Sequence, residues 1–179
     1  MKILAVYPGT FDPIHYGHMD IAQRASRLFD ELLIAVYDKP LKSLVFLPEE
    51  RLGFVQETVN GMGLTNVRVI GYSGLTVEFC RQVGAKVMIR GLRVFSDFEH
   101  EFRMALANHR LAPEIEFVPL ITSEHHTFLS SSTVREIASL GGDVSSMVPP
   151  HVQVAIKRRF AELGEEEGRK VVPMTSLRD

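Results

Sequence analysis

The sequence predicts an α/β fold in which five parallel strands form one doubly wound sheet with helices on both faces. Two observations predict it. Short aliphatic runs alternate along the chain with longer segments in which apolar residues recur three or four positions apart. The 179 residues are 45% hydrophobic and 23% charged, which gives enough apolar material for one packed domain.

Each element follows from its residue pattern. Runs of β-branched and aliphatic residues, typical of buried strands, occupy residues 3–6, 32–37, 67–70, 87–89 and 115–118. Helical spacing is found between them, in residues 18–29, 48–60, 75–83 and 97–111. Because a Rossmann-like sheet of this kind binds ligands at the carboxyl ends of its strands, we expect the functional residues there.

Length and composition limit the organisation and the partners. Residues 1–163 are expected to form a single domain, and residues 164–179 a polar C-terminal extension. Lys and Arg total 20 against 22 for Asp and Glu, so the chain lacks the basic excess of a nucleic-acid binder. No apolar run reaches membrane-spanning or signal-peptide length, so we expect no membrane association and a cytoplasmic location. Cys80 is expected to be a small buried hydrophobic residue, with a catalytic thiol as the alternative.

The first predicted strand leads into a loop with the features of an anion site. Pro8, Gly9 and Pro13 are expected to hold a tight loop beyond the end of the strand. Gly17 leaves the backbone N–H groups at the start of the next helix open to a phosphate. The spacing of the glycines excludes both the P-loop and the G-x-G-x-x-G motif.

Side-chain donors in the same loop favour phosphate binding. The Thr10 hydroxyl and the His18 imidazole, in the first helical turn, can both donate to phosphate oxygens. The alternative is that His15 and His18 are ordinary polar residues at a helix start. A zinc site is a further alternative, but no third ligand stands at a recognisable spacing.

A second cluster follows the fourth predicted strand. Arg90 is expected to end that strand, Gly91 to permit a sharp turn, and Arg93 to lie just beyond. Two guanidinium groups at the carboxyl end of a strand suit anionic oxygens. The alternative is a surface salt-bridge cluster with the acidic residues at positions 97–101.

A third cluster follows the fifth predicted strand. Ser130 or Ser131 is expected to cap a helix N-terminus, with Glu136 in the first turns of the helix. A hydroxyl-rich helix N-terminus is also an anion site.

These clusters together resemble a known family. The segment H-Y-G-H at positions 15–18 is similar to the T/HxGH signature of the nucleotidyltransferase superfamily. The longer patterns are P-G-T-F-D-P from Pro8, I-R-G-L-R-x-x-x-D-F-E-x-E from Ile89 and L-S-S-S from Leu129. These resemble the bacterial phosphopantetheine adenylyltransferases. Family members commonly carry Thr at the first motif position, where this chain has His15.

The resemblance implies transfer of AMP from ATP to 4'-phosphopantetheine, with Mg²⁺ as cofactor. It implies a homohexamer and coenzyme A as a feedback ligand. The implied ATP-binding residues are Thr10, Phe11, His18, Gly91, Leu92, Arg93, Glu101, His126, Thr127, Phe128, Leu129, Ser130, Ser131 and Ser132. The implied acceptor-binding residues are Thr10, Lys42, Thr76 and Arg90, and the catalytic ones are His18 (as transition-state stabiliser), Lys42 and Thr10.

The charge of the reactants favours a mechanism without a protein nucleophile. The acceptor phosphate is already ionised and can attack the α-phosphorus of ATP in line, so positioning and charge stabilisation are the protein's tasks. Two alternatives stay open. One is a glycerol-phosphate or choline-phosphate cytidylyltransferase, and the other is a non-catalytic nucleotide sensor on the same fold.

Overall fold

The computed structural model describes residues 2–40, 44–93 and 95–170. The described strands form one sheet of five parallel strands in the order β3-β2-β1-β4-β5, as the sequence predicts. They are β1 (Leu4–Gly9), β2 (Glu31–Tyr37), β3 (Val67–Tyr72), β4 (Val87–Leu92) and β5 (Glu116–Ile121). The chain winds outward from β1 to β3 and then returns to β4, so the winding reverses between β1 and β4. Ligands bind at this position in doubly wound sheets.

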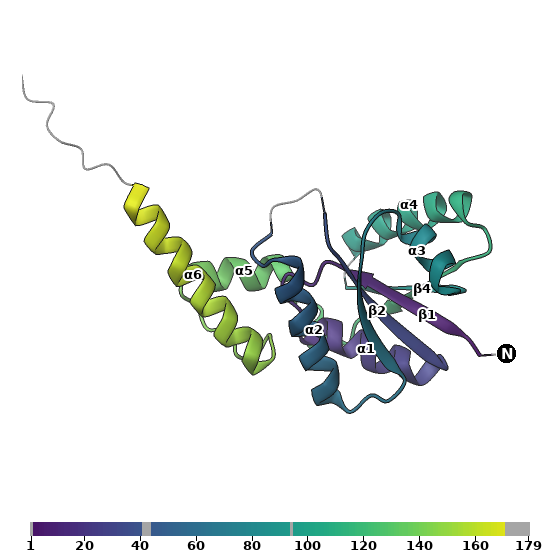
Figure 1. Cartoon of the computed structure of the whole chain (residues 1–179), viewed down its shortest axis with the longest axis horizontal. Coiled ribbons are helices and arrows are strands. Elements are labelled where there is room, and N and C mark those ends of the chain that lie inside the picture. The colour runs from purple at the N-terminus through teal and green to yellow at the C-terminus, as the bar shows by residue number, and fades with distance from the viewer. Residues whose placement is uncertain (1, 41–43, 94, 171–179) are drawn as a thin grey trace, which may run out of the picture.

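Helices connect the strands and continue beyond the last one. They are α1 (Tyr16–Leu28), α2 (Pro48–Met62), α3 (Thr76–Val83), α4 (Phe95–Leu111), the short 3-10 helix η1 (Glu124–His126), α5 (Ser131–Ser139) and α6 (Pro150–Lys170). In Figure 1, α5 and α6 lie beyond α2, on the side of the molecule away from α3 and α4. The sequence patterns did not identify α6. The predicted domain boundary between residues 163 and 164 falls inside this helix.

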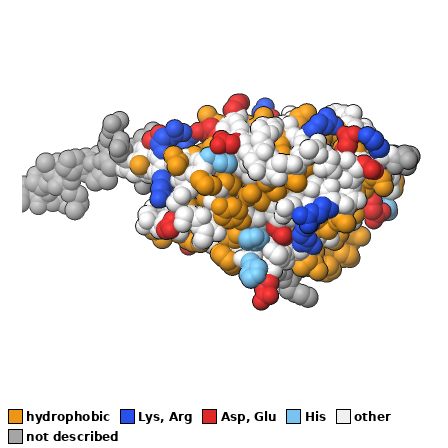
Figure 2. Space-filling view, turned by 90° about the horizontal axis from the view of Figure 1, so that it is seen from below, with side chains coloured by type: hydrophobic (Ala, Val, Ile, Leu, Met, Phe, Trp, Pro, Cys, Tyr) orange, Lys and Arg blue, Asp and Glu red, His pale blue; other side chains and the backbone are white. Residues whose placement is uncertain are grey.

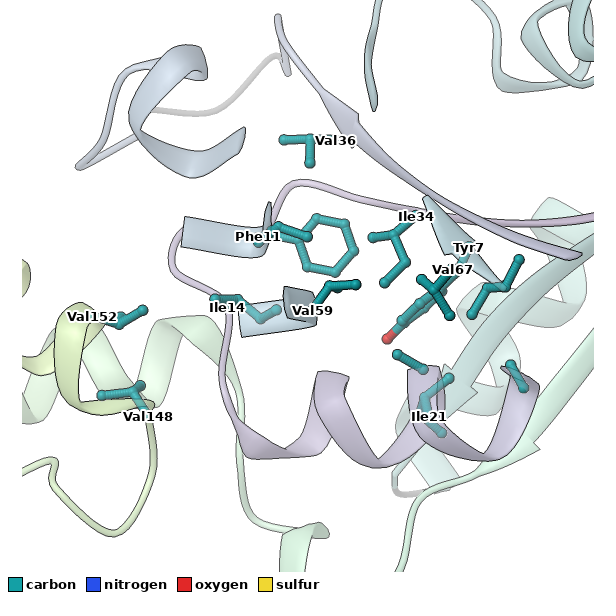
Figure 3. Close-up of a cluster of buried hydrophobic side chains, with 14 of the residues drawn as sticks. Tyr7, Phe11, Ile14, Ile21, Ile34, Val36, Val59, Val67, Val148 and Val152 are labelled. Atoms are coloured by element: carbon teal, nitrogen blue, oxygen red, sulfur yellow. The ribbon is translucent and has the colours of Figure 1, made fainter. Parts of the chain in front are cut away.

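Two hydrophobic clusters cover the two faces of the sheet. Along β2, Ile34 joins the cluster packed against α1, α2 and α6, whereas Leu33 and Ala35 join the cluster packed against α3. Figure 3 shows the first cluster, in which Ile34 lies between Tyr7, Phe11 and Val67. Successive side chains of a strand point to opposite faces, so both faces are buried and the prediction of helices on each is confirmed.

Cys80 belongs to the cluster on the α3 face and is fully buried. Burial raises the pKa of its thiol to about 11, so the reactive thiolate is scarce at neutral pH. This agrees with the expectation of a small buried hydrophobic residue.

Two strand ends differ from the sequence-based expectation. β1 continues through Pro8 and Gly9, which pair with Ala35 and Val36 of β2, so these residues are not part of the loop. Proline fits because β1 pairs with β4 only over Ala5↔Val87 and Val6↔Met88, which leaves Pro8 without a ladder partner on that side.

β4 likewise continues to Leu92, so Arg90 lies within the strand and Gly91 makes no sharp turn. Gly91 allows close packing instead, because a Cβ atom there would lie 3.2 Å from Cγ1 of the buried Ile21, so that side chain would have to shift. Pairing with β5, which includes Gly91↔Leu120, extends the strand beyond its aliphatic run.

Charged side chains of both signs are scattered over the face shown in Figure 2, with hydrophobic side chains gathered between them. Among the described residues, no helix combines the length and the apolar character needed to cross a bilayer.

Candidate active site

A cavity of about 480 Å³ opens where the winding of the sheet reverses, beyond the carboxyl ends of β1 and β4. It brings together parts of all three clusters identified in the sequence. The predicted site residues that line it are Thr10, Phe11, His18, Thr76, Arg90, Gly91, Arg93, Glu101, Ser130, Ser131 and Ser132.

His15 and His18 fix the start of α1 through a reciprocal capping arrangement. His15 is the N-cap, and its Nδ1 accepts a hydrogen bond from the backbone N–H of His18 at 3.3 Å. The Nδ1 of His18 in turn accepts from the backbone N–H of His15 at 3.3 Å. The two rings stack with centroids 3.7 Å apart. His15 therefore orients His18 from the helix start.

The hydrogen bonds also define the tautomers. An Nδ1 that accepts from a backbone N–H carries no proton, so in neutral His18 the proton is on Nε2, which can donate to a ligand. Burial, followed by the charges of Arg93 and His126, lowers the pKa of His15 to about 3. His15 is thus neutral at physiological pH and keeps its role as hydrogen-bond acceptor.

The loop between β1 and α1 is held by side chains beneath it. Arg51 of α2 is fully buried and donates from Nη1 to the carbonyl oxygens of Thr10 and Tyr37, both at 2.6 Å. It also donates to the carbonyl oxygens of Asp38 at 3.0 Å and Phe46 at 3.3 Å. One guanidinium group thereby joins the β1–α1 loop to the segment that follows β2.

Asp12 makes a second connection between the same segments. Its buried carboxylate accepts from the backbone N–H groups of Val45 and Phe46, both at 3.0 Å. Arg135 of α5 donates to the Asp12 carbonyl oxygen at 2.6 Å and lies 3.4 Å from its carboxylate. Asp12 therefore joins the β1–α1 loop and the start of α5, which border the cavity, to the segment at Val45 and Phe46.

At the end of β4, Arg90 and Glu101 form a bidentate ion pair. Nε of Arg90 lies 2.9 Å from Oε2 of Glu101, and Nη2 lies 2.7 Å from Oε1. Burial alone would lower the pKa of Arg90, but the hydrogen bonds and charge of Glu101 outweigh this and raise it. Arg90 therefore does pair with one of the acidic residues at positions 97–101, as the alternative interpretation of this cluster expected. The pair lines the cavity, however, and is not part of a surface cluster.

Arg93 links the second and third clusters. Its Nη1 donates to the Leu129 carbonyl oxygen at 2.8 Å. Leu129 itself is buried, and the neighbouring Phe128 is exposed; neither lines the cavity. Leu92 also lies outside the lining.

The third cluster is positioned by capping. Ser130 is the N-cap of α5 and accepts from the Thr133 backbone N–H at 2.9 Å, so the predicted cap is confirmed. The Ser131 hydroxyl donates to the Pro13 carbonyl oxygen at 2.9 Å, which holds this helix start against the β1–α1 loop. Thr127 uses its hydroxyl locally, on the carbonyl oxygens of residues 123 and 124.

The remaining predicted residues lie at the borders of the site or outside the described part. His126 ends η1, and its Cβ would lie 3.7 Å from a Cβ placed on Gly17. Thr76 begins α3, and its hydroxyl lies 2.9 Å from that of Tyr72. Lys42 falls outside the described residues, and its role stays a prediction.

Sequence reasoning missed several residues of the lining and of its support. The missed lining residues include Tyr7, Tyr37, Tyr72, Met88, His100, Met104, Asn108, Phe117 and Thr122. Tyr37 and Tyr72 stand at the carboxyl ends of β2 and β3, where the rule for doubly wound sheets would have placed them. The supporting residues Asp12, Arg51 and Arg135 bind mainly backbone groups, which no side-chain pattern reveals.

Comparison with known proteins first shows to which class of protein the chain belongs. Residues 6–137 match the model of a family described as cytidylyltransferase-like. The nicotinic acid mononucleotide adenylyltransferase of Plasmodium falciparum complexed with NaAD shares the fold. Its TM-score is 0.67 over 92% of this chain and 97% of that chain, at 14% identity. Fold and family model together define a nucleotidyltransferase.

Closer relatives define the family. A phosphopantetheine adenylyltransferase of Herpetosiphon aurantiacus is 53% identical over 157 residues, which is 88% of this chain and 94% of that protein. One of Methylococcus capsulatus is 50% identical over 164 residues, covering 92% and 100%. The chain belongs to the phosphopantetheine adenylyltransferase family, as the motifs predicted, and the cytidylyltransferase alternative is not favoured.

Proposed function

We propose that this enzyme transfers AMP from ATP to 4'-phosphopantetheine, forming dephospho-coenzyme A and pyrophosphate. The observation that carries the proposal is that His18, Arg90 and the hydroxyl-rich start of α5 line the same cavity. In a chain of this family, these donors can bind a triphosphate and a second anionic group next to each other.

The reaction proceeds by in-line displacement. An oxygen of the acceptor phosphate forms a bond to the α-phosphorus of ATP while the bond to the β-phosphate bridging oxygen breaks. Negative charge grows on the α-phosphate oxygens and the leaving pyrophosphate. The Nε2–H of His18 and the Thr10 hydroxyl donate to that charge, together with Lys42 as predicted. The acceptor phosphate needs no deprotonation, so His18 acts as a stabiliser of the transition state.

ATP and the acceptor occupy different parts of the cavity in this proposal. Gly91, Arg93 and the helix start at Ser130–Ser132 hold the nucleotide phosphates. Arg90 binds the acceptor phosphate, and Thr76 lies toward the acceptor's pantetheine arm.

Mg²⁺ fits this arrangement as a partner of the ATP phosphates. Among the described residues, no three His, Cys, Asp or Glu side chains form a group able to hold a metal ion. The phosphate oxygens would therefore supply most ligands, as is usual for Mg²⁺ in nucleotide sites. Bound there, the ion supplies charge neutralisation to the triphosphate.

The proposed assembly is a homohexamer in the cytoplasm, with coenzyme A as a feedback ligand of the same cavity. Kinship suggests the hexamer. On α4, Phe98, Phe102 and Leu106 form an exposed apolar stripe at helical spacing, which suits contact with another subunit. Light scattering after size-exclusion chromatography measures the mass, and a monomer at micromolar concentration would contradict the proposal.

The function is tested by pyrophosphate release from ATP or CTP with Mg²⁺ and 4'-phosphopantetheine. We expect release with ATP, and at least a hundredfold loss of kcat in the His18→Ala variant, consistent with removal of one transition-state donor. His125→Ala, at an exposed position, serves as control and should retain full turnover. A preference for CTP would indicate a cytidylyltransferase, and nucleotide binding without release would indicate a sensor. A folded His18→Ala variant within about threefold of wild type would contradict the role of His18.

A further inference from the structure

Thr122, directly after β5, carries a hydroxyl group at the wall of the cavity. Its backbone N–H donates to the Leu92 carbonyl oxygen at 2.7 Å, so its position is fixed relative to β4. The residue is 7% exposed and lines the cavity. No hydrogen bond joins its hydroxyl to another described residue, and among those residues the one side-chain polar atom that is both unpaired and sealed off is Oδ1 of Asp38. The Thr122 hydroxyl is therefore open to the cavity and can bond to a ligand.

This hydroxyl lies on the face of the sheet that α1 covers. Ile89 of β4 belongs to the hydrophobic cluster on that face, so Gly91, two positions further on, faces the same way. A Cβ placed on Gly91 would lie 3.9 Å from Oγ1 of Thr122 and 3.2 Å from Cγ1 of Ile21. Arg90 faces the opposite side, where it pairs with α4. In the proposed function, the hydroxyl is therefore on the nucleotide side of the cavity, away from the acceptor phosphate.

The surroundings of the hydroxyl suit a neutral group better than a phosphate. Asp20 of α1 accepts from the backbone N–H of Ser123, the next residue, at 3.1 Å. Asp20 also pairs with Arg24 at 3.3 Å, and Arg24 donates to the Ile121 carbonyl oxygen at 2.6 Å. The two charges next to this position thus balance each other, and the side chain of Ile21 adds an apolar wall. A hydroxyl that can donate and accept, in such a setting, suits another hydroxyl group.

The position relative to His18 selects the ribose within the nucleotide. Ile21 follows His18 by three residues on α1, so the two side chains are neighbours on one face of the helix. In the proposed function, His18 donates to the α-phosphate and Gly91 lies beside the phosphates, so Thr122 stands next to the groups that hold them. The ribose is bonded to the α-phosphate through its C5' atom, whereas the base is one unit further away. The nearest neutral hydroxyl groups of ATP are therefore those on C2' and C3' of the ribose.

We propose that the Thr122 hydroxyl forms a hydrogen bond with a ribose hydroxyl of ATP and thereby selects ribonucleotides over deoxynucleotides. This inference rests on the proposed function, because it needs the α-phosphate at His18. It adds a specificity-determining residue that lies outside the three motifs of the sequence.

The test is a cycle that removes the two partners in turn, the hydroxyl of the protein in Thr122→Val and a hydroxyl of the nucleotide in 2'-deoxy-ATP or 3'-deoxy-ATP. In Thr122→Val, kcat/KM for ATP should fall about fivefold to tenfold, as for the loss of one neutral hydrogen bond. For the deoxynucleotide that lacks the bonded hydroxyl, the variant and the wild type should agree within about twofold.

Two further variants separate this contact from a structural effect. Thr122→Ser keeps the hydroxyl and should keep the wild-type preference for ATP. Thr58→Val is the matched control, because Thr58 is 4% exposed, lies outside the cavity lining, and donates to the Phe54 carbonyl oxygen at 2.7 Å. It should keep the preference for ATP whatever its stability.

An equal loss with ATP and with both deoxynucleotides in Thr122→Val, or no loss with ATP, would overturn the ribose contact. A wild type that uses ATP and both deoxynucleotides equally well would overturn it even if Thr122→Val fails to fold. Calorimetric titration with the same three nucleotides distinguishes this inference from the proposed function. A wild type that binds ATP more tightly than one of the deoxynucleotides, with that preference lost in Thr122→Val, supports the contact even if it releases no pyrophosphate, a result that would contradict the proposed function alone.

Discussion

The buried guanidinium group of Arg51 allows a sharp stability test. It is fully buried and donates to four backbone carbonyl oxygens, those of Thr10, Tyr37, Asp38 and Phe46. Burial lowers its pKa, while Asp12, Asp38 and Glu49 oppose that shift, so the charge is retained by the surrounding acceptors. Arg51→Met keeps the length and much of the volume of the side chain but removes every donor.

The magnitude follows from the acceptors left behind. Each carbonyl oxygen left without a donor costs roughly 1–3 kcal/mol, and water entry recovers part of the sum. We therefore expect Arg51→Met to lower the free energy of unfolding by about 3–5 kcal/mol, as for breaking a buried charged network. For a chain of this size that corresponds to a fall in Tm of roughly 6–20 °C.

The assay is urea unfolding at a fixed protein concentration, because self-association would make apparent stability depend on it. Arg68→Met is the matched control: this arginine is 67% exposed and lies 3.4 Å from Glu31 in a single ion pair. Its loss should cost less than about 1 kcal/mol. If the two variants agreed within about 1 kcal/mol, the reasoning about buried carbonyl acceptors would be refuted.

Three further predictions concern the core and the start of α1. His15 has a pKa of about 3 when folded against about 6.5 when unfolded, so the unfolded chain binds more protons below pH 6.5 and stability falls as pH drops toward 3. Titration of His15 should therefore lower the free energy of unfolding by about 2 kcal/mol between pH 7 and pH 5. The His15→Asn variant keeps a good N-cap, and its free energy of unfolding, measured with urea, should depend less steeply on pH. His125→Asn, at an exposed position, should keep the wild-type pH dependence, and a similar flattening in both variants would contradict the assignment. Ile89→Ala, at a side chain with 0% exposure, should cost about 2–5 kcal/mol in the same assay, and a cost below about 1 would mean that the site collapses around the deletion. Gly91→Ala should destabilise the protein by about 1–3 kcal/mol through overpacking against Ile21. Gly53→Ala, in a helical position where a Cβ would have nothing within 4 Å, should stabilise the protein slightly. Effects of the same sign in the two variants would refute the packing argument.

The alternation of aliphatic runs and helical segments was sufficient to predict the parallel sheet, because its strands are buried on both faces. It could not give the strand ends. Pro8, Gly9 and Gly91 join their strands because β2 and β5 offer pairing partners, and that information lies elsewhere in the chain. The helix α6 could have been found, since Val152, Ala155 and Ile156 are buried at helical spacing.

The candidate site was predictable where a side chain of distinctive chemistry stands near the carboxyl end of a strand or at the start of a helix. His18, Arg90 and Ser130 were found in that way, with the family resemblance assigning their roles. The pairing of Arg90 with Glu101 was visible only as one of several alternatives, because the spacing also allowed other acidic partners. Arg51 was not predictable, since a carbonyl oxygen is present at every residue and no pattern shows which four a buried guanidinium group will meet.

The short pairing between β1 and β4 has a consequence for the lifetime of the folded chain. Only two residue pairs join these strands, whereas six join β1 to β2 and six join β4 to β5. The boundary between β1 and β4 therefore has the fewest paired residues of those in the described sheet, and the cavity opens directly beyond it. A ligand that contacts both sides bridges the boundary and adds its binding free energy to the cohesion of the two halves. In the proposed function, the nucleotide and acceptor concentrations in the cell then help determine how often the sheet opens and how long each molecule of enzyme survives.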